Sequence, residues 1–396
     1  MLPALRRPLA VLAAVALAAV PVAASAASPG WQLVHAPSPG HGVFNAFFVS
    51  VAQVSPTDVW AVGSDNGHPL IENWNGSAWT VSPVPKLPRK SAELNGVSAD
   101  GPNDVCAVGD TVNSQGVDRR TLALHWDGTA WSVVHTPNFS VTPGSGSILN
   151  SVVAISPTDA WAVGQGLNND ANQLVALVEH WNGTRWHQVP TPTPLGKVQW
   201  LTGVSAGGPS DIWAVGVDDT SLAAATLTVH FDGSKWTTVP SPNPVDGNSQ
   251  NDLSAVTVIS PSDAWAVGTE GNVNNQNFRV PLVLHWTGSA WSQVSAPNPG
   301  SEGTGVFGVA ALGASDVWAV GETYQAEVGA PFLTYAAQWN GTKWTQVATP
   351  NGPNPTGISN LSAITALSDG ELWAVGTATP AKGCCERVLT AHDPTG

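Results

Sequence analysis

The residues of this chain with the clearest capacity for chemistry are histidines and aspartates that recur together. Both residue types are common in acid–base catalysis and at metal sites. A histidine precedes a tryptophan or phenylalanine four times, and each time an aspartate lies 19 to 22 residues before that histidine. The four pairs are Asp104 with His125, Asp159 with His180, Asp211 with His230, and Asp263 with His285.

The repetition of these pairs favours a structural role. A catalytic or metal site would occur once, whereas a donor also faces the acidic residue in other repeats, with Asn73 for Asp58 and Gln338 for Asp316. Leaving a buried carboxylate without such a partner is strongly destabilising. We therefore interpret the pairs as structural hydrogen bonds and predict no catalytic residue and no metal ligand. Catalysis at one of the pairs is the alternative.

The aspartate of each pair opens a phrase, Asp-x-Trp-Ala-Val-Gly, that runs along the whole chain. Its tryptophan, replaced once by Cys106, recurs at intervals of 46 to 55 residues, and the last copy begins with Glu371. This interval is the length of one four-stranded propeller blade. The sequence therefore predicts an all-β fold, a seven-bladed β-propeller of four-stranded antiparallel blades.

Each repeat predicts the same hairpin between its third and fourth strands. Turns such as Asn182-Gly183 separate a strand ending in tryptophan from one beginning with tryptophan, as at Trp181 and Trp186. Asn-Gly between apolar strands is typical of a two-residue turn in which both residues take positive φ. We expect both tryptophans on one face of the sheet, packed against the neighbouring blade. A sugar stacked on these tryptophans is the alternative.

The two ends of the chain complete one blade. After Trp373 a third strand is expected near Val388 to His392, and no fourth strand follows. The stretch Trp31-Gln32-Leu33-Val34 matches the fourth-strand phrase Trp236-Thr237-Thr238-Val239. We predict that residues 31–36 form the outer strand of the last blade, which removes two exposed sheet edges.

The first 26 residues are typical of an export signal. Arg6 and Arg7 precede an apolar stretch from Leu9 to Val20, and Ala24-Ser25-Ala26 suits cleavage after Ala26. We therefore predict a secreted protein whose residues 27–396 form a single, monomeric domain without a membrane span. The formal charge of −14 argues against nucleic acid and anionic membranes as partners.

A ligand site is expected on the face that carries the long loops, because binding residues concentrate on variable loops held by a rigid scaffold. Those loops are residues 165–173, 190–199, 269–277 and 321–330. Trp200 lies before the innermost strand of one blade, near the mouth of the central channel. Positions equivalent to it include further candidates for ligand binding: Phe47, Glu93, Asp252 and Asn360, besides Ile148 and Gly305. Trp200 covering a neighbouring loop is the alternative.

No cofactor is predicted from these loops. Oxygen-rich runs at residues 65–67, 168–170, 218–219 and 271–277 leave a calcium site as an alternative to ordinary Asn turns. Cys106 is expected to be a buried thiol, and Cys384 and Cys385 could bridge each other in an exported protein.

The repeated phrases resemble the Trp-rich propeller repeats of exported bacterial proteins, and the resemblance covers residues 31–396. The chain is similar more distantly to kelch and WD-repeat propellers. The Gly-Gly doublet of kelch repeats is missing, and His125-Trp126-Asp127 lacks the Gly-His phrase that precedes such an ending in WD repeats. Sialidases also carry small hairpins with tryptophan, but they need an arginine triad and a tyrosine nucleophile that this sequence does not bring together.

The resemblance specifies the architecture and leaves several functions open. We expect a non-enzymatic binding module for an extracellular carbohydrate or protein. A glycoside hydrolase or lyase acting on polysaccharide through acids such as Glu93 and Asp252 is the first alternative. An architectural surface protein is the second. Fold alone does not decide among them.

Overall fold

The computed structural model of this chain describes residues 30–395 apart from short segments at 40–44, 88, 90, 115, 117, 139–145, 169–172, 193–197, 220–222, 245–248, 273–274, 326–330, 368 and 381–384. The predicted export signal at residues 1–26 and Cys384 lie outside the described residues. The regular elements in the described part are 28 β-strands, and none of its segments forms a helix that could cross a membrane.

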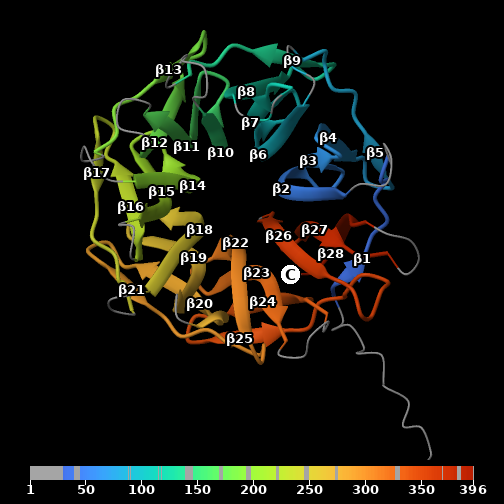
Figure 1. The fold of residues 1–396 in the computed structure, drawn as a ribbon, viewed down its shortest axis with the longest axis vertical. Coiled ribbons are helices and arrows are strands. Elements are labelled where there is room, and N and C mark those ends of the chain that lie inside the picture. The colour runs from blue at the N-terminus through green and yellow to red at the C-terminus, as the bar shows by residue number, and fades with distance from the viewer. Residues whose placement is uncertain are drawn as a thin grey trace, which may run out of the picture.

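The strands form four-stranded antiparallel blades around a central opening (Figure 1). The first, innermost strands are β2 (Ala46–Ser55), β6 (Ser91–Gly101), β10 (Ser147–Ser156), β14 (Val198–Gly208), β18 (Ser249–Ser260), β22 (Gly303–Gly313) and β26 (Ser359–Ala366). The second strands are β3 (Asp58–Asp65), β7 (Asp104–Val112), β11 (Asp159–Asn168), β15 (Asp211–Asp219), β19 (Asp263–Asn272), β23 (Asp316–Tyr324) and β27 (Leu372–Ala378).

The outer half of each blade follows the same order. The third strands are β4 (His68–Trp74), β8 (Arg119–Trp126), β12 (Gln173–Trp181), β16 (Ala224–Phe231), β20 (Asn275–Trp286), β24 (Leu333–Trp339) and β28 (Arg387–Asp393). The fourth strands are β5 (Trp79–Val81), β9 (Trp131–Val134), β13 (Trp186–Gln188), β17 (Trp236–Thr238), β21 (Trp291–Gln293), β25 (Trp344–Val347) and β1 (Gln32–Leu33). The prediction of an all-β fold built from four-stranded antiparallel blades is confirmed.

One sheet of 12 strands runs from β14 to β25. Its four-stranded groups are joined by two parallel contacts of one residue pair each, Ala224 with Gln250 and Arg279 with Gly303. The other sheets contain four strands each.

The last blade contains both ends of the described chain. Strand β1 pairs antiparallel with β28 through Gln32–His392 and Leu33–Ala391, and the Val34 amide donates to the Thr390 carbonyl at 3.0 Å. This strand is shorter than the predicted 31–36: its ladder holds two residue pairs, and Val34 continues the contact with Thr390.

The glycine of the repeated phrase is required by a bulge in the adjacent inner strand. In β14 the pairing shifts by one residue between Leu201 and Gly203, which brings the Trp200 carbonyl against Gly216. A Cβ at Gly216 would lie 2.1 Å from that carbonyl oxygen. The same contact, 1.9 to 2.2 Å from a backbone carbonyl oxygen, recurs at glycines 63, 109, 164, 268, 321 and 376. A side chain at any of these positions would push the inner strand away.

The hairpins between third and fourth strands differ from the predicted two-residue turn. Trp181 pairs directly with Trp186, so residues 182–185 form a four-residue connection. Gly183 has a positive φ of 86°, whereas Asn182 does not. The Asn182 Oδ1 atom instead accepts hydrogen bonds from the Thr184 amide (3.1 Å), the Thr184 hydroxyl (2.8 Å) and the Arg185 amide (3.1 Å).

Tryptophans fill the junctions between blades. The second-strand tryptophan of one blade packs against the third- and fourth-strand aromatics of the next. Trp213, for example, lies 4.8 Å from Trp286 and 5.0 Å from Trp291 between ring centroids. Trp31 closes the set by packing at 5.9 Å against Trp318. These aromatic groups hold the blades together.

The connections define two faces of the ring. The short-turn face carries the links between first and second strands and between third and fourth strands, such as 157–158 and 182–185. The long-loop face carries the links between blades and between second and third strands. The predicted loop 269–277 is mostly strand, because β19 and β20 extend across all but residues 273–274, and the first four residues of the predicted loop 321–330 belong to β23.

Candidate functional site

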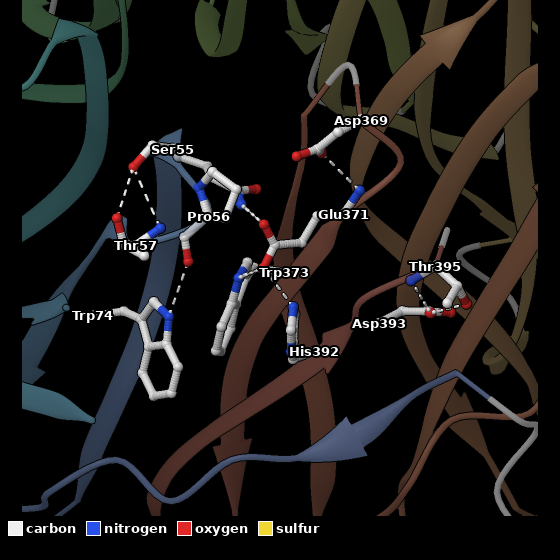
Figure 2. Close-up of polar contacts among 11 residues, drawn as sticks. Ser55, Pro56, Thr57, Trp74, Asp369, Glu371, Trp373, His392, Asp393 and Thr395 are labelled. Carbon is white, nitrogen blue, oxygen red and sulfur yellow. Dashed lines mark hydrogen bonds and ion pairs between the residues drawn. The ribbon is translucent and has the colours of Figure 1, made fainter. Parts of the chain in front are cut away.

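The four predicted acid–histidine pairs lie on the short-turn face. The His Nε2 atom is 2.7 Å from the carboxylate in Asp104–His125, 2.8 Å in Asp159–His180 and Asp211–His230, and 2.9 Å in Asp263–His285. Asn73 donates to Asp58 at 2.8 Å and Gln338 donates to Asp316 at 2.9 Å. Sequence reasoning missed one further pair, Glu371 with His392 at 2.6 Å (Figure 2).

Four of the five acid–histidine pairs lie against the tryptophan beside them, and the fifth, Asp104–His125, has Cys106 in that place. His180 stacks on Trp161 at 4.2 Å, and the Trp161 indole N–H donates to Asp159 at 3.0 Å. Figure 2 shows the same arrangement around Glu371, whose carboxylate contacts both Trp373 and His392. Such contacts fix the indole at the junction between two blades.

The candidate ligand residues occupy equivalent positions around the channel. Each lies near the start of an innermost strand, at the long-loop face, and pairs with the residue that follows the repeated glycine. These pairs are Phe47–Ser64, Glu93–Asp110, Ile148–Gln165, Trp200–Val217, Asp252–Thr269, Gly305–Glu322 and Asn360–Thr377. All except the buried Gly305 are partly exposed.

The structure gathers two of these residues, Asp252 and Asn360, around a shared set of polar side chains. Burial raises the pKa of Asp252, while the nearby Arg279 opposes that shift and Asp219 adds to it. Burial also raises the pKa of Glu322, opposed by a hydrogen bond with Tyr324, by Arg279 and by a hydrogen bond with Asn360. Strands β18, β20, β22, β23 and β26 bring this cluster together.

The backbone of Arg279 is joined to the neighbouring blade. Its amide donates to the Glu302 carbonyl at 3.1 Å, and its backbone pairs with Gly303, where a Cβ would lie 1.9 Å from the Arg279 carbonyl oxygen. The guanidinium lies 5.2 Å from the centroid of the Tyr324 ring, within cation–π range. The exposed cation therefore lies at the Tyr324 ring, within electrostatic reach of Asp252 and Glu322.

Glu93 belongs to a second polar group on the opposite part of the ring. It lies near Asp110, whose pKa burial raises to about 6, with Arg119 opposing the shift and Glu93 adding to it. An Arg119 Nη1 atom lies 2.9 Å from the Asp110 carboxylate. Arg89 and Arg120 both contact Asp118 nearby, at 2.8 and 3.0 Å. Three arginines therefore lie close together here, whereas both tyrosines of the chain, Tyr324 and Tyr335, belong to β23 and β24 of another blade.

The aromatic candidates and the candidate acids remain apart. Phe47 and Trp200 lie on β2 and β14, which stand on opposite sides of the central opening (Figure 1). Glu93 on β6 and Asp252 on β18 are separated by β10 and β14. Between the inner strands the channel is hollowed at two levels, of about 200 and 310 Å³.

Sequence reasoning missed Arg279, Glu322 and Tyr324. A signal was present in Glu322 and Asp110, which follow the repeated glycine where other repeats have uncharged residues. Arg279 has no such signal, because its place depends on contacts among three blades. Within the described residues, no group of three or more His, Cys, Asp or Glu side chains is arranged to hold a metal ion.

Comparison with known proteins supports the fold. No protein-family model and no curated protein matches the chain. The solved structure described as YCF48 bound to D1 peptide is 13% identical, with a TM-score of 0.56, and the match covers 93% of this chain and 96% of that one. YCF48 from Cyanidioschyzon merolae is 16% identical, with a TM-score of 0.52 and coverage of 92% and 99%. This likeness confirms a Trp-rich β-propeller and extends to the fold alone.

Proposed function

We propose that the chain is an exported, monomeric, seven-bladed β-propeller that acts as a non-enzymatic binding module and holds a basic segment of another protein over its long-loop face. In this proposal the 12-stranded sheet counts as three blades, because single residue pairs alone join its four-stranded groups. Residues 1–26 direct export, and residues 27–396 form the domain.

One observation carries the choice of site. The cluster of Asp252, Glu322, Asn360 and Tyr324 around Arg279 combines residues from three consecutive blades at the channel mouth. Burial has already removed much of the water from its two carboxyl groups. Arg279 acts on both of these carboxyl groups. A lysine or arginine of a ligand would give one of them a charge partner of its own.

Two observations favour a polypeptide over a carbohydrate. Sugar-binding surfaces rely on aromatic rings that form a platform, and here Phe47 and Trp200 stand on opposite sides of the opening. One structure of similar fold is described as bound to a peptide. The net charge of −14 adds long-range attraction for a basic partner.

The other readings need features that the cluster lacks. A glycoside hydrolase requires two carboxyl groups flanking one bond. Glu93 and Asp252, the acids suggested for that role, lie three blades apart along the ring. An architectural protein would not need an arginine near the partly exposed Asp252 and the buried Glu322. The expectation of no cofactor stays a prediction, with a calcium ion in the loops as its alternative.

Binding to peptide and glycan arrays tests the proposal directly. Lysine- and arginine-rich peptides should bind in preference to acidic peptides, with affinity that falls as salt rises from 50 to 300 mM. The D252N/E322Q variant should weaken this binding about tenfold or more. The matched control is D127N, which removes a carboxylate from a hairpin on the opposite face while keeping its hydrogen-bond acceptor.

Three results would overturn the proposal in different ways. Unchanged peptide binding by D252N/E322Q would remove this site. Binding to glycans without binding to peptides would replace the protein ligand by a carbohydrate. Release of reducing sugars from a polysaccharide would support the hydrolase.

A further inference from the structure

One junction between blades has a gap where the others have an indole ring. Between the β6–β9 and β10–β13 blades, Cys106 occupies the position of the second-strand tryptophan. The space beside it is lined by Cys106 and His125 from one blade and by Trp181 and Trp186 from the next. The enclosed part measures about 50 Å³ and adjoins an open hollow of about 490 Å³ on the short-turn face.

A second residue departs from the repeat in the same place. The position of Asp100 holds apolar residues elsewhere, such as Val54, Ile155 and Ile259, and these pack onto the core clusters of their own junctions. Asp100 is exposed beside Asp104, and burial together with the Asp104 charge raises its pKa. The gap therefore lacks the indole ring of the other junctions and has two acidic side chains, Asp100 and Asp104, at its opening.

His125 shows the consequence of the missing indole. Its side chain is 36% exposed, whereas the exposed fraction of its counterparts His180, His230, His285 and His392 is 20 to 25%. In other blades the tryptophan stacks on this histidine, as Trp265 does on His285 at 4.0 Å and 12°. At the gap no tryptophan of the repeat covers His125, so the face of its ring is open for an aromatic ring to stack on.

The filled junctions indicate what the gap can hold. Figure 2 shows the junction in which Trp373 contacts Glu371 and lies near Trp74. Trp373 also stacks on His392 at 4.3 Å and meets Trp79 edge to face at 5.2 Å. The corresponding partners in the gap are Asp104, His125, Trp181 and Trp186, so the face and edge contacts of an indole are provided, and Asp104 corresponds to the acids that accept the N–H of Trp161 and Trp373.

We propose that this gap binds an indole ring that carries a neutral or cationic arm. The ring would enter from the short-turn face, stack on His125, meet Trp186 edge to face and donate its N–H to Asp104. The arm would lie in the outer hollow beside Asp100. Apolar and aromatic walls favour an aromatic ring, and acidic side chains at the opening disfavour an anionic arm.

The Cys106 thiol forms a wall of this site and takes part in no covalent step. Burial, with the Asp104 and Asp100 charges, raises its pKa to about 12, so it stays protonated at neutral pH. The site lies on the face opposite the Arg279 cluster. Failure of either proposal therefore leaves the other standing.

Calorimetric titration of the whole protein with indole, tryptamine, 1-methylindole and indole-3-acetate tests the inference. We expect dissociation constants on the order of 0.1–1 mM for indole, which has few atoms to contribute. Tryptamine should bind more tightly, 1-methylindole about tenfold more weakly because it lacks the N–H, and indole-3-acetate most weakly.

Two variants at one position provide the control. C106W places the repeat's own indole in the gap and should abolish binding while raising the melting temperature. C106A keeps the gap and removes the thiol, so it should bind indole within about threefold of the unchanged protein. Binding of indole by C106W, or no binding by the unchanged protein and C106A, would overturn the inference.

A short peptide with an internal tryptophan identifies the source of the ring. Binding of this peptide as tightly as tryptamine would assign the gap to a tryptophan side chain of a partner protein. Binding of tryptamine without the peptide would assign it to a free indole amine.

Discussion

At the scale of single residues, the repeated glycine shows how a backbone contact determines a motif. Gly216 faces the Trp200 carbonyl at a distance that excludes any side chain. We expect G216A to lower the free energy of unfolding by more than about 2 kcal/mol, because the inner strand must shift. Urea unfolding of the variant measures this loss.

Gly208 provides the matched control for that substitution. It lies at the end of the same inner strand, and nothing lies within 4 Å of a Cβ built there. G208A should change stability by less than about 1 kcal/mol. Equal losses in G216A and G208A would contradict the bulge as the reason for the motif.

A buried carboxyl group gives the stability a specific pH dependence. Glu179 is fully buried without a hydrogen-bond partner in the described structure, and burial raises its pKa to about 8. Between about pH 4.5 and 8 the unfolded chain loses this proton while the folded chain keeps it. Stability should therefore fall as pH rises through that range, by at most about 1.4 kcal/mol per pH unit.

The E179L variant isolates this contribution. Leucine already occupies the equivalent position at Leu124 and Leu284, where it is buried. The advantage of E179L over the unchanged protein should grow with pH between 4.5 and 8 and stay constant outside this window. Chemical unfolding at several pH values measures the difference, and a difference independent of pH would show that Glu179 does not titrate as described.

At the scale of elements, the hairpins depend on one side-chain oxygen more than on a turn type. Asn182 accepts three hydrogen bonds within its hairpin, whereas the hairpin between β20 and β21 has Thr287 at this place. N182A should cost about 1 kcal/mol, and T287N should gain a similar amount by adding the missing acceptor. Thermal unfolding of both variants tests the pair, and a destabilised T287N would show that the oxygen is not what the Thr287 hairpin lacks.

The elements that could be predicted from the sequence were those with local signals. The Asp-x-Trp-Ala-Val-Gly strand and its partners were recognisable because period, turn residues and apolar alternation agree. The two-residue turn was wrong, because the cap by Asn182 holds a longer connection. The extent of β19 and β20 was also missed, since loop composition at residues 269–277 conceals a ladder that continues almost to the tip.

The residues of the candidate site also divide into those with a local sequence signal and those without one. Equivalent positions such as Trp200 and Asp252 could be found because the repeat fixes their register. The cluster around Arg279 could not, because it depends on a bond between separate blades and on Tyr324 at the end of a strand. The gap at Cys106 was visible as a departure from the repeat, but its acidic mouth required knowing what Val54 and Ile155 pack against in other blades.

At the scale of the whole molecule, closure of the ring depends on contacts between residues more than 350 positions apart in sequence. Trp31 is 1% exposed and belongs to the core cluster that contains Trp318 and Leu389. W31A should lower the free energy of unfolding by about 3–5 kcal/mol, because it leaves a cavity and loosens the strand that joins the two ends. Denaturant unfolding followed by tryptophan fluorescence measures the effect. The matched control is L33A on the same strand, where the side chain is 44% exposed and a change below about 0.5 kcal/mol is expected. Similar small losses in both variants would mean that β1 adds little to closure, and the stability of the ring would then rest on the contacts between its inner strands.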